Sequence, residues 1–306
     1  MANVLVIGGT GFIGTNLTDE LRERGHSVWT ADVSFAADER HYRADIGEYR
    51  QVAEVFEERD FDYVYNAAAE YGRWNGEDHY ENLWRTNAVG TKNILRLQAE
   101  EGFRLIQFSS AEVYGDRSGN LTEDLTERKS IHLLNDYAMS KQVNEMQVKN
   151  AMEKFDTNSV MVRPVNCYGP HEHYSEYRGV VPIFIWHALN DEPYTVYQGH
   201  RRIFDYVGDT ARTLANIIDN FYPGEVYNLG GNPDWEITIT KLSDLILEYL
   251  DKDDDIVTYE DEEPMTTEEK RIDSSKAREH LNHNPTVPPE AGIPRTIDWF
   301  KEEYDL

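Results

Sequence analysis

Short apolar runs alternate with longer amphipathic segments along the first 165 residues of the chain. The apolar runs are rich in β-branched and aromatic residues and have the length of strands, whereas the segments between them repeat with a helical period. Near-continuous apolar strands separated by helices are typical of a parallel sheet covered on both faces. We expect strands at "NVLVIG", "SVWTA", "FDYVYNAA", "FRLIQFSS" and "NSVMVRPVN", and helices over 14–24, 47–58, 78–101 and 134–154.

Right-handed crossovers between such strands produce a doubly wound sheet. The fold class is therefore expected to be α/β, a Rossmann-type doubly wound parallel sheet with a smaller C-terminal lobe. Beyond Pro164 the pattern becomes irregular and is interrupted by several prolines, with helices expected near 240–250 and 290–303. We expect residues 1–165 to form the sheet domain, to which later segments return, and residues 166–306 to form mainly the lobe, which packs over the open edge of the sheet.

Composition narrows the class of protein. The 306 residues contain no apolar run near the ~20 residues that a bilayer requires, and the N-terminus lacks the pattern of a secretory signal. We therefore expect a soluble, cytoplasmic protein. A single cysteine, Cys167, excludes an internal disulfide, and without a Cys/His cluster no structural metal site is expected.

The charge is strongly negative, with 57 acidic against 30 basic residues and a net charge of −27. Such a surface repels nucleic acids and anionic membranes, so neither is an expected partner. The acidic residues are spread along the whole chain, and the basic residues comprise 20 Arg but only 10 Lys. This combination predicts adaptation to molar salt, where a Debye length of about 3 Å screens self-repulsion.

A glycine-rich turn follows the first expected strand. In "VLVIGGTGFIGTNL" the glycines are Gly8, Gly11 and Gly14, and Phe12 and Ile13 lie between the last two. Glycines at this spacing permit a tight turn and let backbone amides and a helix N-terminus approach a pyrophosphate. Asp32 ends the second strand, where a carboxylate accepts both ribose hydroxyls of NAD, and no Arg follows immediately to receive the 2′-phosphate of NADP.

Two further strand ends carry candidate cofactor contacts. Asp45 and Ile46 lie where a third strand should end, so Asp45 is expected either to bind the adenine amino group, with Ile46 covering the ring, or to cap the following helix. Ala67 and Ala68 close the fourth strand with the small side chains that a close approach to a cofactor requires. Simple packing at the strand end is the alternative.

The stretch "FSSAEVYG" ends the fifth strand with Ser110 and Glu112, and it is either a polar turn or one side of an active site. The next helix contains Tyr137 and Lys141, which are four residues apart and so project from one face. A neighbouring ammonium favours the phenolate, so we expect Lys141 to lower the pKa of Tyr137 and make it a general base. The carboxyl end of the fifth strand lies on the same edge of the sheet as the glycine turn.

Together these motifs resemble the extended short-chain dehydrogenase/reductases of the nucleotide-sugar epimerase and dehydratase type, over essentially the whole chain. The matching positions are the glycine turn, Asp32, Asp45 with Ile46, Asn87 in "TNAVGTKNIL", "SSAEVYG", Tyr137 with Lys141, "RPVNCYGP" with Pro164, and "RIFDYVGD". The resemblance implies bound NAD and a nucleotide-sugar substrate. It also implies a homodimer formed by the helices near 80–101 and 134–154, whose apolar residues face either the sheet or the partner.

The resemblance further implies a mechanism of transient oxidation at C4 of the sugar. Tyr137 removes the hydroxyl proton with help from Ser110, and Lys141 holds the nicotinamide ribose. Asn87 and Pro164 belong to the cofactor-binding positions. Asn166 corresponds to an asparagine near the sugar or diphosphate and Arg202 to the arginine that meets the diphosphate. Arg73, in an unusual segment "EYGRWNGEDHY", either binds a substrate carboxylate or pairs with a surface acid.

The reaction that follows oxidation depends on the residues after Ser110. Relatives that are 4,6-dehydratases carry an Asp-Glu pair there, whereas this chain has Ala111 and Glu112. The missing aspartate favours a 4-epimerase, with a dehydratase or a sugar-acid decarboxylase on the same scaffold as alternatives. Glu112 is expected to transfer a proton at C5 or to cap the turn. A protein that binds NAD as a sensor or scaffold without catalysis is the alternative of a different class.

Overall fold

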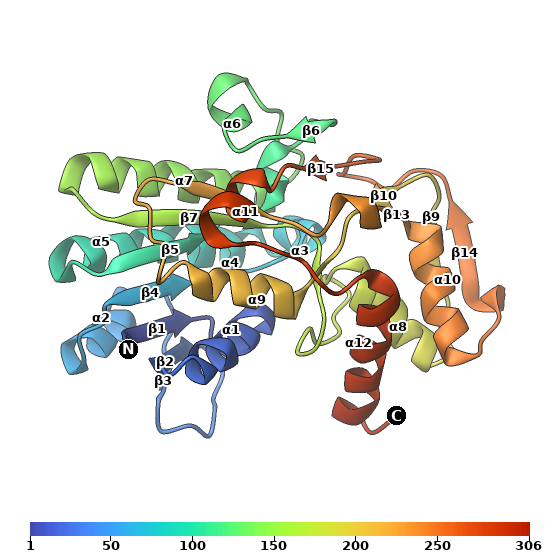
Figure 1. Cartoon of the computed structure of the whole chain (residues 1–306), viewed down its shortest axis with the longest axis horizontal. Coiled ribbons are helices and arrows are strands. Elements are labelled where there is room, and N and C mark those ends of the chain that lie inside the picture. Colours follow the sequence, from blue (N-terminus) through green and yellow to red (C-terminus); the bar gives the residue numbers. More distant parts are fainter.

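Seven parallel strands form the central sheet in the computed structural model, which describes residues 1–306 (Figure 1). The spatial order is β12-β7-β5-β4-β1-β2-β3, so the chain order reverses between β1 and β4. In α/β sheets a ligand crevice opens at such a switch point, outside the carboxyl ends of the strands. The strands are β1 (Asn3–Ile7), β2 (Ser27–Asp32), β3 (His41–Arg43), β4 (Tyr63–Asn66), β5 (Arg104–Phe108), β7 (Ser159–Pro164) and β12 (Val226–Leu229).

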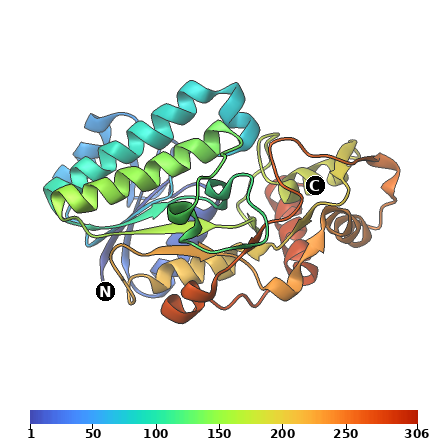
Figure 2. The same cartoon turned by 90° about the horizontal axis from the view of Figure 1, so that it is seen from above.

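Both faces of the sheet are buried, as the apolar strands predict. Along β1, Val4 and Val6 pack on one face and Leu5 and Ile7 on the other, because successive side chains of a strand alternate. Helices α2 (Tyr49–Glu58), α5 (Thr91–Glu101) and α7 (Asp136–Phe155) cover the Leu5 face. Helices α1 (Phe12–Glu23), α9 (Val207–Asn216) and α11 (Ser275–Leu281) cover the other (Figure 2). The expected Rossmann-type doubly wound sheet is thus confirmed.

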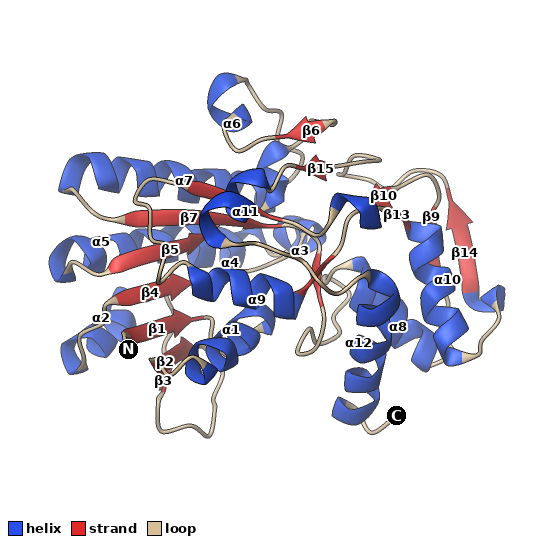
Figure 3. Cartoon of the chain, in the orientation of Figure 1, coloured by secondary structure: helices blue, strands red, loops and turns tan.

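A second apolar core lies beside the sheet domain (Figure 3). It is built by α8 (Val180–Leu189), α10 (Ile239–Leu250) and α12 (Pro289–Glu303), with β9 (Tyr194–Tyr197) paired to β14 (Val257–Glu260) and a 3₁₀ turn at Asp254–Ile256. Two short pairs join this lobe to the sheet domain, β8 (Cys167–Tyr168) with β11 (Asp205–Tyr206) and β10 (Arg201–Arg202) with β13 (Ile237–Thr238). A 3₁₀ turn, Pro233–Trp235, precedes β13.

Segments after residue 165 return to the sheet domain. Strand β12 pairs with β7 at one edge of the sheet, and α9 packs against α1. Strand β15 (Arg271–Ile272) pairs with β6 (Asn120–Leu121) beside the short helix α6 (Leu125–Arg128). No helix of the structure has both the length and the apolar character needed to cross a bilayer.

The helix expected over 78–101 is confirmed from residue 80 to residue 101, where it runs without a break but contains a π-helical turn. The elements of this region are α3 (Arg73–Asp78), α4 (Tyr80–Trp84), the π-helical turn (Arg85–Gly90) and α5. Asn87 lies in the π-helical turn, and its buried side chain accepts a hydrogen bond from the backbone of Glu70 (2.9 Å) and donates one back to it (3.0 Å). Long-range bonding of this kind accompanies the widened turn, and π-helical turns occur often at functional sites.

Candidate active site

A cavity of about 1020 Å³ opens at the carboxyl ends of the sheet strands, between the sheet domain and the C-terminal lobe. Its lining includes the residues just beyond β1, β2, β4, β5 and β7 as well as side chains of α8 and β9. With one exception, every residue predicted from the sequence to belong to the site lines this cavity. The exception is Asn87, whose side chain instead holds the backbone of Glu70, itself a lining residue.

The turn after β1 has room for backbone only. A Cβ on Gly14 would lie 1.9 Å from the carbonyl oxygen of Gly8, and one on Gly8, whose φ is +80°, would lie 2.6 Å from the nitrogen of Ala68. Gly11 is the N-cap of α1 and supplies no side-chain cap, so the first amides of the helix point toward the cavity without a competing side chain. This geometry fits the pyrophosphate of a dinucleotide.

Asp32 lies at the end of β2, with both carboxylate oxygens held by backbone amides. Oδ2 accepts from the nitrogen of Thr10 (3.1 Å) and Oδ1 from that of Ser34 (3.2 Å), which fixes the carboxylate at the cavity wall. A fixed carboxylate beside the glycine turn fits the ribose hydroxyls of NAD. Arg43 donates from Nε to the carbonyl of Val33 (3.1 Å), one residue beyond Asp32.

Asp45 does not cap the helix that follows it. The N-cap of α2 is Glu48, whereas Asp45 accepts a bond from the nitrogen of Gly47 (2.8 Å) and pairs with Arg85 (3.1 Å). The helix-capping alternative for Asp45 is therefore wrong. Ile46 is buried, and both Asp45 and Ile46 line the cavity together with Ala44. The contact of Asp45 and Ile46 with adenine stays a prediction.

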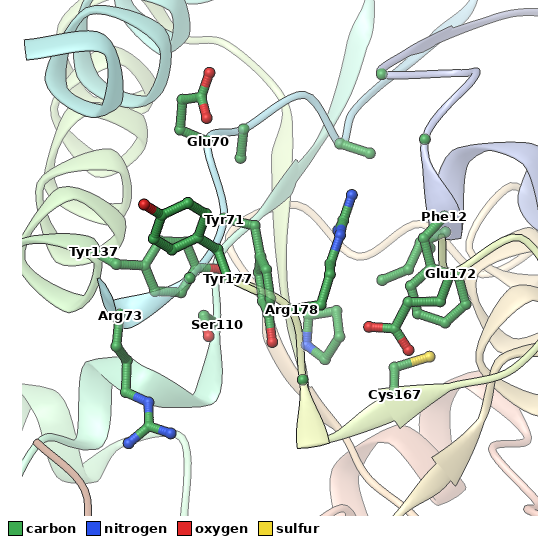
Figure 4. A pocket seen from close by; sticks show the side chains of 18 of the residues that line it. Phe12, Glu70, Tyr71, Arg73, Ser110, Tyr137, Cys167, Glu172, Tyr177 and Arg178 are labelled. Carbon is green, nitrogen blue, oxygen red and sulfur yellow. The ribbon is translucent and has the colours of Figure 1, made fainter. Parts of the chain in front are cut away.

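Ser110, Tyr137 and Lys141 all line the cavity (Figure 4 labels Ser110 and Tyr137). Ser110 caps the 3₁₀ turn Ala111–Tyr114, accepting from the nitrogen of Glu112 at 3.2 Å. Tyr137 and Lys141 lie on the buried face of α7, which begins at the Asn135 cap. The turn at the end of β5 and the first turns of α7 thus bring a hydroxyl, a phenol and an amine to one place.

The surroundings of Tyr137 in the cavity do not lower its pKa. Burial and the neighbouring Tyr71 raise it well above its ordinary value, while the Ser110 hydroxyl, which faces Tyr137, lowers it only in part. The expected effect of Lys141 is absent because its Nζ donates to the carbonyl of Phe108 (3.1 Å) and lies 5.7 Å from the centre of the Tyr137 ring. Burial also lowers the pKa of Lys141 to about 8.

Glu112 is held by an ion pair that the sequence did not predict. Its Oε1 lies 3.0 Å from Nζ of Lys270, which comes from the segment just before β15. Burial alone would raise the pKa of Glu112, but Lys270, Arg73 and Arg202 together hold it below its ordinary value. Glu112 is therefore a carboxylate at neutral pH and does not merely cap a turn.

The two arginines predicted to meet the substrate are engaged by the protein itself. Arg73 forms an ion pair with Glu263 and donates to the carbonyl of Pro264 (3.1 Å). Arg202 is buried and donates to the carbonyls of Arg201, Thr267 and Glu268 and to the hydroxyl of Thr266, at 2.7–3.1 Å. Both line the cavity, and both tie the segment 263–268 to its mouth.

Among the cavity residues that sequence reasoning missed are Glu172 and Arg178, in the segment between β8 and α8. The stretch "HEHYSEYRGV" follows "RPVNCYGP" and precedes an apolar helix, so its position beside the site was readable. Its charges, however, looked like those of the rest of this acidic surface. Asn166 and Cys167, from the preceding strand, line the same side of the cavity.

A buried ion pair supports the site from behind. Arg163 on β7 and Glu145 on α7 form two bonds of 2.7 Å, and neither side chain is exposed. Glu145 also accepts from Ser109 (2.6 Å), and Arg163 donates to the hydroxyl of Tyr114 (2.8 Å). This network joins α7, which carries Tyr137, to the turn that carries Ser110.

Three relatives illustrate what the chain is similar to. UDP-glucuronic acid decarboxylase 1 of Danio rerio is 31% identical over 99% of this chain and 73% of its own length. dTDP-glucose 4,6-dehydratase of Neisseria meningitidis serogroup B is 28% identical over 98% of this chain and 93% of its own. The crystal structure of UDP-glucose 4-epimerase with UDP-glucose from Thermotoga maritima gives a TM-score of 0.89 at 25% identity and covers 99% of both chains.

A family model also matches residues 4–230, which include the glycine turn, the Ser110 turn and the Tyr137 helix. Its description is the NAD dependent epimerase/dehydratase family. The named relatives divide among decarboxylases, dehydratases and epimerases, so similarity identifies the enzyme class and the cofactor and leaves the final reaction open. The chain belongs to the NAD dependent epimerase/dehydratase family of enzymes.

Proposed function

We propose that the chain is a nucleotide-sugar 4-epimerase. NAD, which the glycine turn and Asp32 would hold, would supply reversible hydride transfer at C4 of the sugar, so that the hydride could return on the opposite face. Tyr137 takes the proton of the C4 hydroxyl and Ser110 holds that hydroxyl by a hydrogen bond, while Lys141, which donates to the carbonyl of Phe108, would hold the nicotinamide ribose. Because the sequence of steps returns both hydride and proton, the substrate and product have the same mass.

The observation that carries the proposal is the environment of Ala111 and Glu112. Elimination of water needs an acid and a base beside C5 and C6, and here Ala111 offers no ionisable group. Glu112 is a carboxylate that Lys270 holds at 3.0 Å, so it has no proton to give at neutral pH. Neither residue after Ser110 therefore offers an acid for dehydration, which supports the 4-epimerase over the dehydratase.

Replacement of Tyr137 by Phe tests this proposal. We expect kcat to fall by about 10²–10⁴-fold, because the general base is lost while the cavity is kept. Bound NAD should remain, and the epimer ratio of a UDP-sugar or dTDP-sugar can be followed by NMR in molar salt. Normal turnover by this variant would overturn the proposed base. Loss of water or of carbon dioxide in the wild-type mass spectrum would reject the 4-epimerase in favour of a dehydratase or a decarboxylase.

A sugar-acid decarboxylase is the second candidate, and the charges around Glu112 favour it. Arg73, Arg202 and Lys270 provide three positive charges there against those of Glu112 and Glu263, so one anionic group would balance the cluster. A uronic acid carboxylate has the required charge. After oxidation at C4, such a substrate loses carbon dioxide without the missing acid, and a UDP-glucuronic acid assay distinguishes it from the epimerase by a loss of mass.

We also propose a homodimer that functions at high salt. On the helices expected to form the dimer, the apolar residues Leu83, Ile94, Leu95, Leu97 and Val148 are buried within the chain, whereas Met146 is 61% exposed. Val89 is also exposed, and the contact of Gln147 with the carbonyl of Ala88 (3.2 Å) places the two exposed residues on adjoining helices. This outer face of α7 and the π-helical turn is the proposed interface.

A further inference from the structure

Glu172 is a buried carboxyl group whose bonding is incomplete. Its side chain is only 3% exposed and lines the cavity, yet Oε2 has no hydrogen-bond partner. A buried polar atom without a partner costs about 1–3 kcal/mol, and most such atoms in native proteins find one. The unpaired oxygen therefore indicates that a ligand completes its bonding.

Arg178 is the complementary group six residues away. It lines the cavity half-buried, and its guanidinium forms no ion pair although the chain holds 57 acidic residues. Figure 4 shows its side chain extending into the cavity, with Tyr177 on one side and Phe12 and Glu172 on the other. Arg73 and Arg202, by contrast, are already bonded to the segment 263–268. Arg178 is thus the cavity arginine available to an anion.

The chemistry of the two groups selects the ligand. A guanidinium donates paired hydrogen bonds to phosphate oxygens, and a carboxylic acid that keeps its proton donates one more. Phe12, which lies beside Glu172 in Figure 4, belongs to the glycine turn that faces the cavity with free backbone amides. We propose that Arg178 and Glu172 bind a diphosphate group, either that of NAD or that of the nucleotide sugar. The identity of these two ligands rests on the proposed function.

The proton on Glu172 follows from its surroundings. Burial raises its pKa to about 8, and Arg178 opposes this only in part. The other groups that face it are neutral, because burial raises the pKa of Cys167 well above its ordinary value and enclosure in the cavity raises that of Tyr71 to about 12. The remaining ionisable residues of the segment that line the cavity are His171, His173, Glu176 and Tyr177.

Diphosphate binding is therefore linked to a proton. Ionised Glu172 would repel the diphosphate, so affinity falls as the pH rises through 8, by up to about tenfold per pH unit. Lys141 also titrates near this pH, so the wild type alone does not isolate the effect. The variant Glu172→Gln does, because its amide cannot ionise and still donates a hydrogen bond.

Calorimetric titration in molar KCl at pH 7 and pH 9 tests the subsite with two probes, UDP and, after removal of any retained cofactor, NAD. One of the two ligands is expected to place its diphosphate in the subsite. For that ligand, Glu172→Gln should bind as tightly as the wild type at pH 7. From pH 7 to pH 9 the affinity of the wild type should fall at least about fivefold more than that of Glu172→Gln. Arg178→Gln should weaken that ligand about tenfold or more at both pH values, and Arg178→Lys less. Glu290→Gln, at an exposed residue of α12 that does not line the cavity, is the control that should change neither.

The outcomes separate the two proposals. If NAD and UDP bind the wild type but Glu172→Gln and Arg178→Gln bind them with wild-type affinity and pH dependence, the diphosphate subsite is wrong. A selective effect on NAD assigns it to the cofactor, and one on UDP to the substrate. If neither probe binds the wild type, the proposed nucleotide-sugar function fails first. Circular dichroism and melting curves identify any variant that has not folded, and Arg178→Lys then replaces Arg178→Gln.

Discussion

Two glutamate–arginine arrangements in this chain differ in how completely they are bonded. Glu145 and Arg163 are fully buried and joined by two bonds of 2.7 Å, and neighbouring hydroxyls and a carbonyl satisfy their other atoms. Glu172 and Arg178 share a loop at the cavity, form no ion pair, and leave a carboxyl oxygen unpartnered. In the core the polar groups are hydrogen-bonded to one another, whereas in the cavity these two charged groups lack partners within the chain and can bind a ligand.

The largest expected effect comes from breaking the closed pair. Glu145→Ala leaves the guanidinium of Arg163 buried without its carboxylate, which should cost about 3–5 kcal/mol of unfolding free energy. Urea unfolding in molar KCl measures this loss. The double variant Glu145→Leu with Arg163→Met should recover much of it, since no charge is then left buried. A single variant as stable as the wild type would show that the network does not support the fold.

The open pair should affect stability in the opposite direction. The pKa of Glu172 is about 8 in the folded chain and near its ordinary 4.5 when unfolded, so between these values the folded state binds the extra proton. Stability contributed by the protonated acid is present below pH 4.5 and lost as the pH rises to 8. Glu172→Gln should be more stable than the wild type at pH 9 by about 2–4 kcal/mol and similar at pH 5. If Glu172→Gln and the wild type are equally stable at pH 9, the pKa of Glu172 is not raised in the folded chain.

A third pair, Glu112 with Lys270, is intermediate in its bonding. Its charges are paired within the chain at 3.0 Å, yet Glu112 lines the cavity. Lys270→Met removes the main cation that holds the pKa of Glu112 low, so burial should then raise it. We expect the acid limb of the kcat/KM profile to move upward by about one pH unit or more. Lys276→Met, which breaks an exposed pair with Glu225, is the matched control and should leave the profile in place. An unmoved limb in both variants would mean that Glu112 takes no part in turnover.

The smallest expected effect is on assembly at the outer face of α7. Met146→Glu places a charge on the proposed interface and should raise the dimer dissociation constant by about tenfold or more, without changing the fold of the protomer. Light scattering over a range of concentrations measures it. Phe35→Glu, at a residue 80% exposed on the opposite edge of the sheet, should leave assembly unchanged. A wild-type protein that is monomeric at every concentration would reject the interface.

The sequence was informative where local rules determine position. The glycine turn, Asp32 and Ser110 follow apolar strands, so their place at one edge of a parallel sheet was predictable. Tyr137 and Lys141 share a face because of the helical period. Each of these residues lines the cavity, although the pKa of Tyr137 moves in the direction that burial dictates and not in the expected one.

It was less informative where distant segments meet. Lys270 reaches Glu112 from 158 residues away because β15 pairs with β6, a two-residue contact without any periodic signal. Arg202 matched a family position, yet its donors are taken by backbone carbonyls whose location no local pattern reveals. The π-helical turn within the helix over 80–101 likewise involves Asn87 and the backbone of Glu70, which lie 17 positions apart.

The ion pair between Arg73 and Glu263 joins α3 to the segment 263–268 across the mouth of the cavity. Both side chains are partly exposed, so dissolved ions weaken their attraction far more than that of the buried pair. We expect dissolved ions to open this pair more often, and thereby to shorten the residence time of a ligand in the cavity as the salt concentration rises.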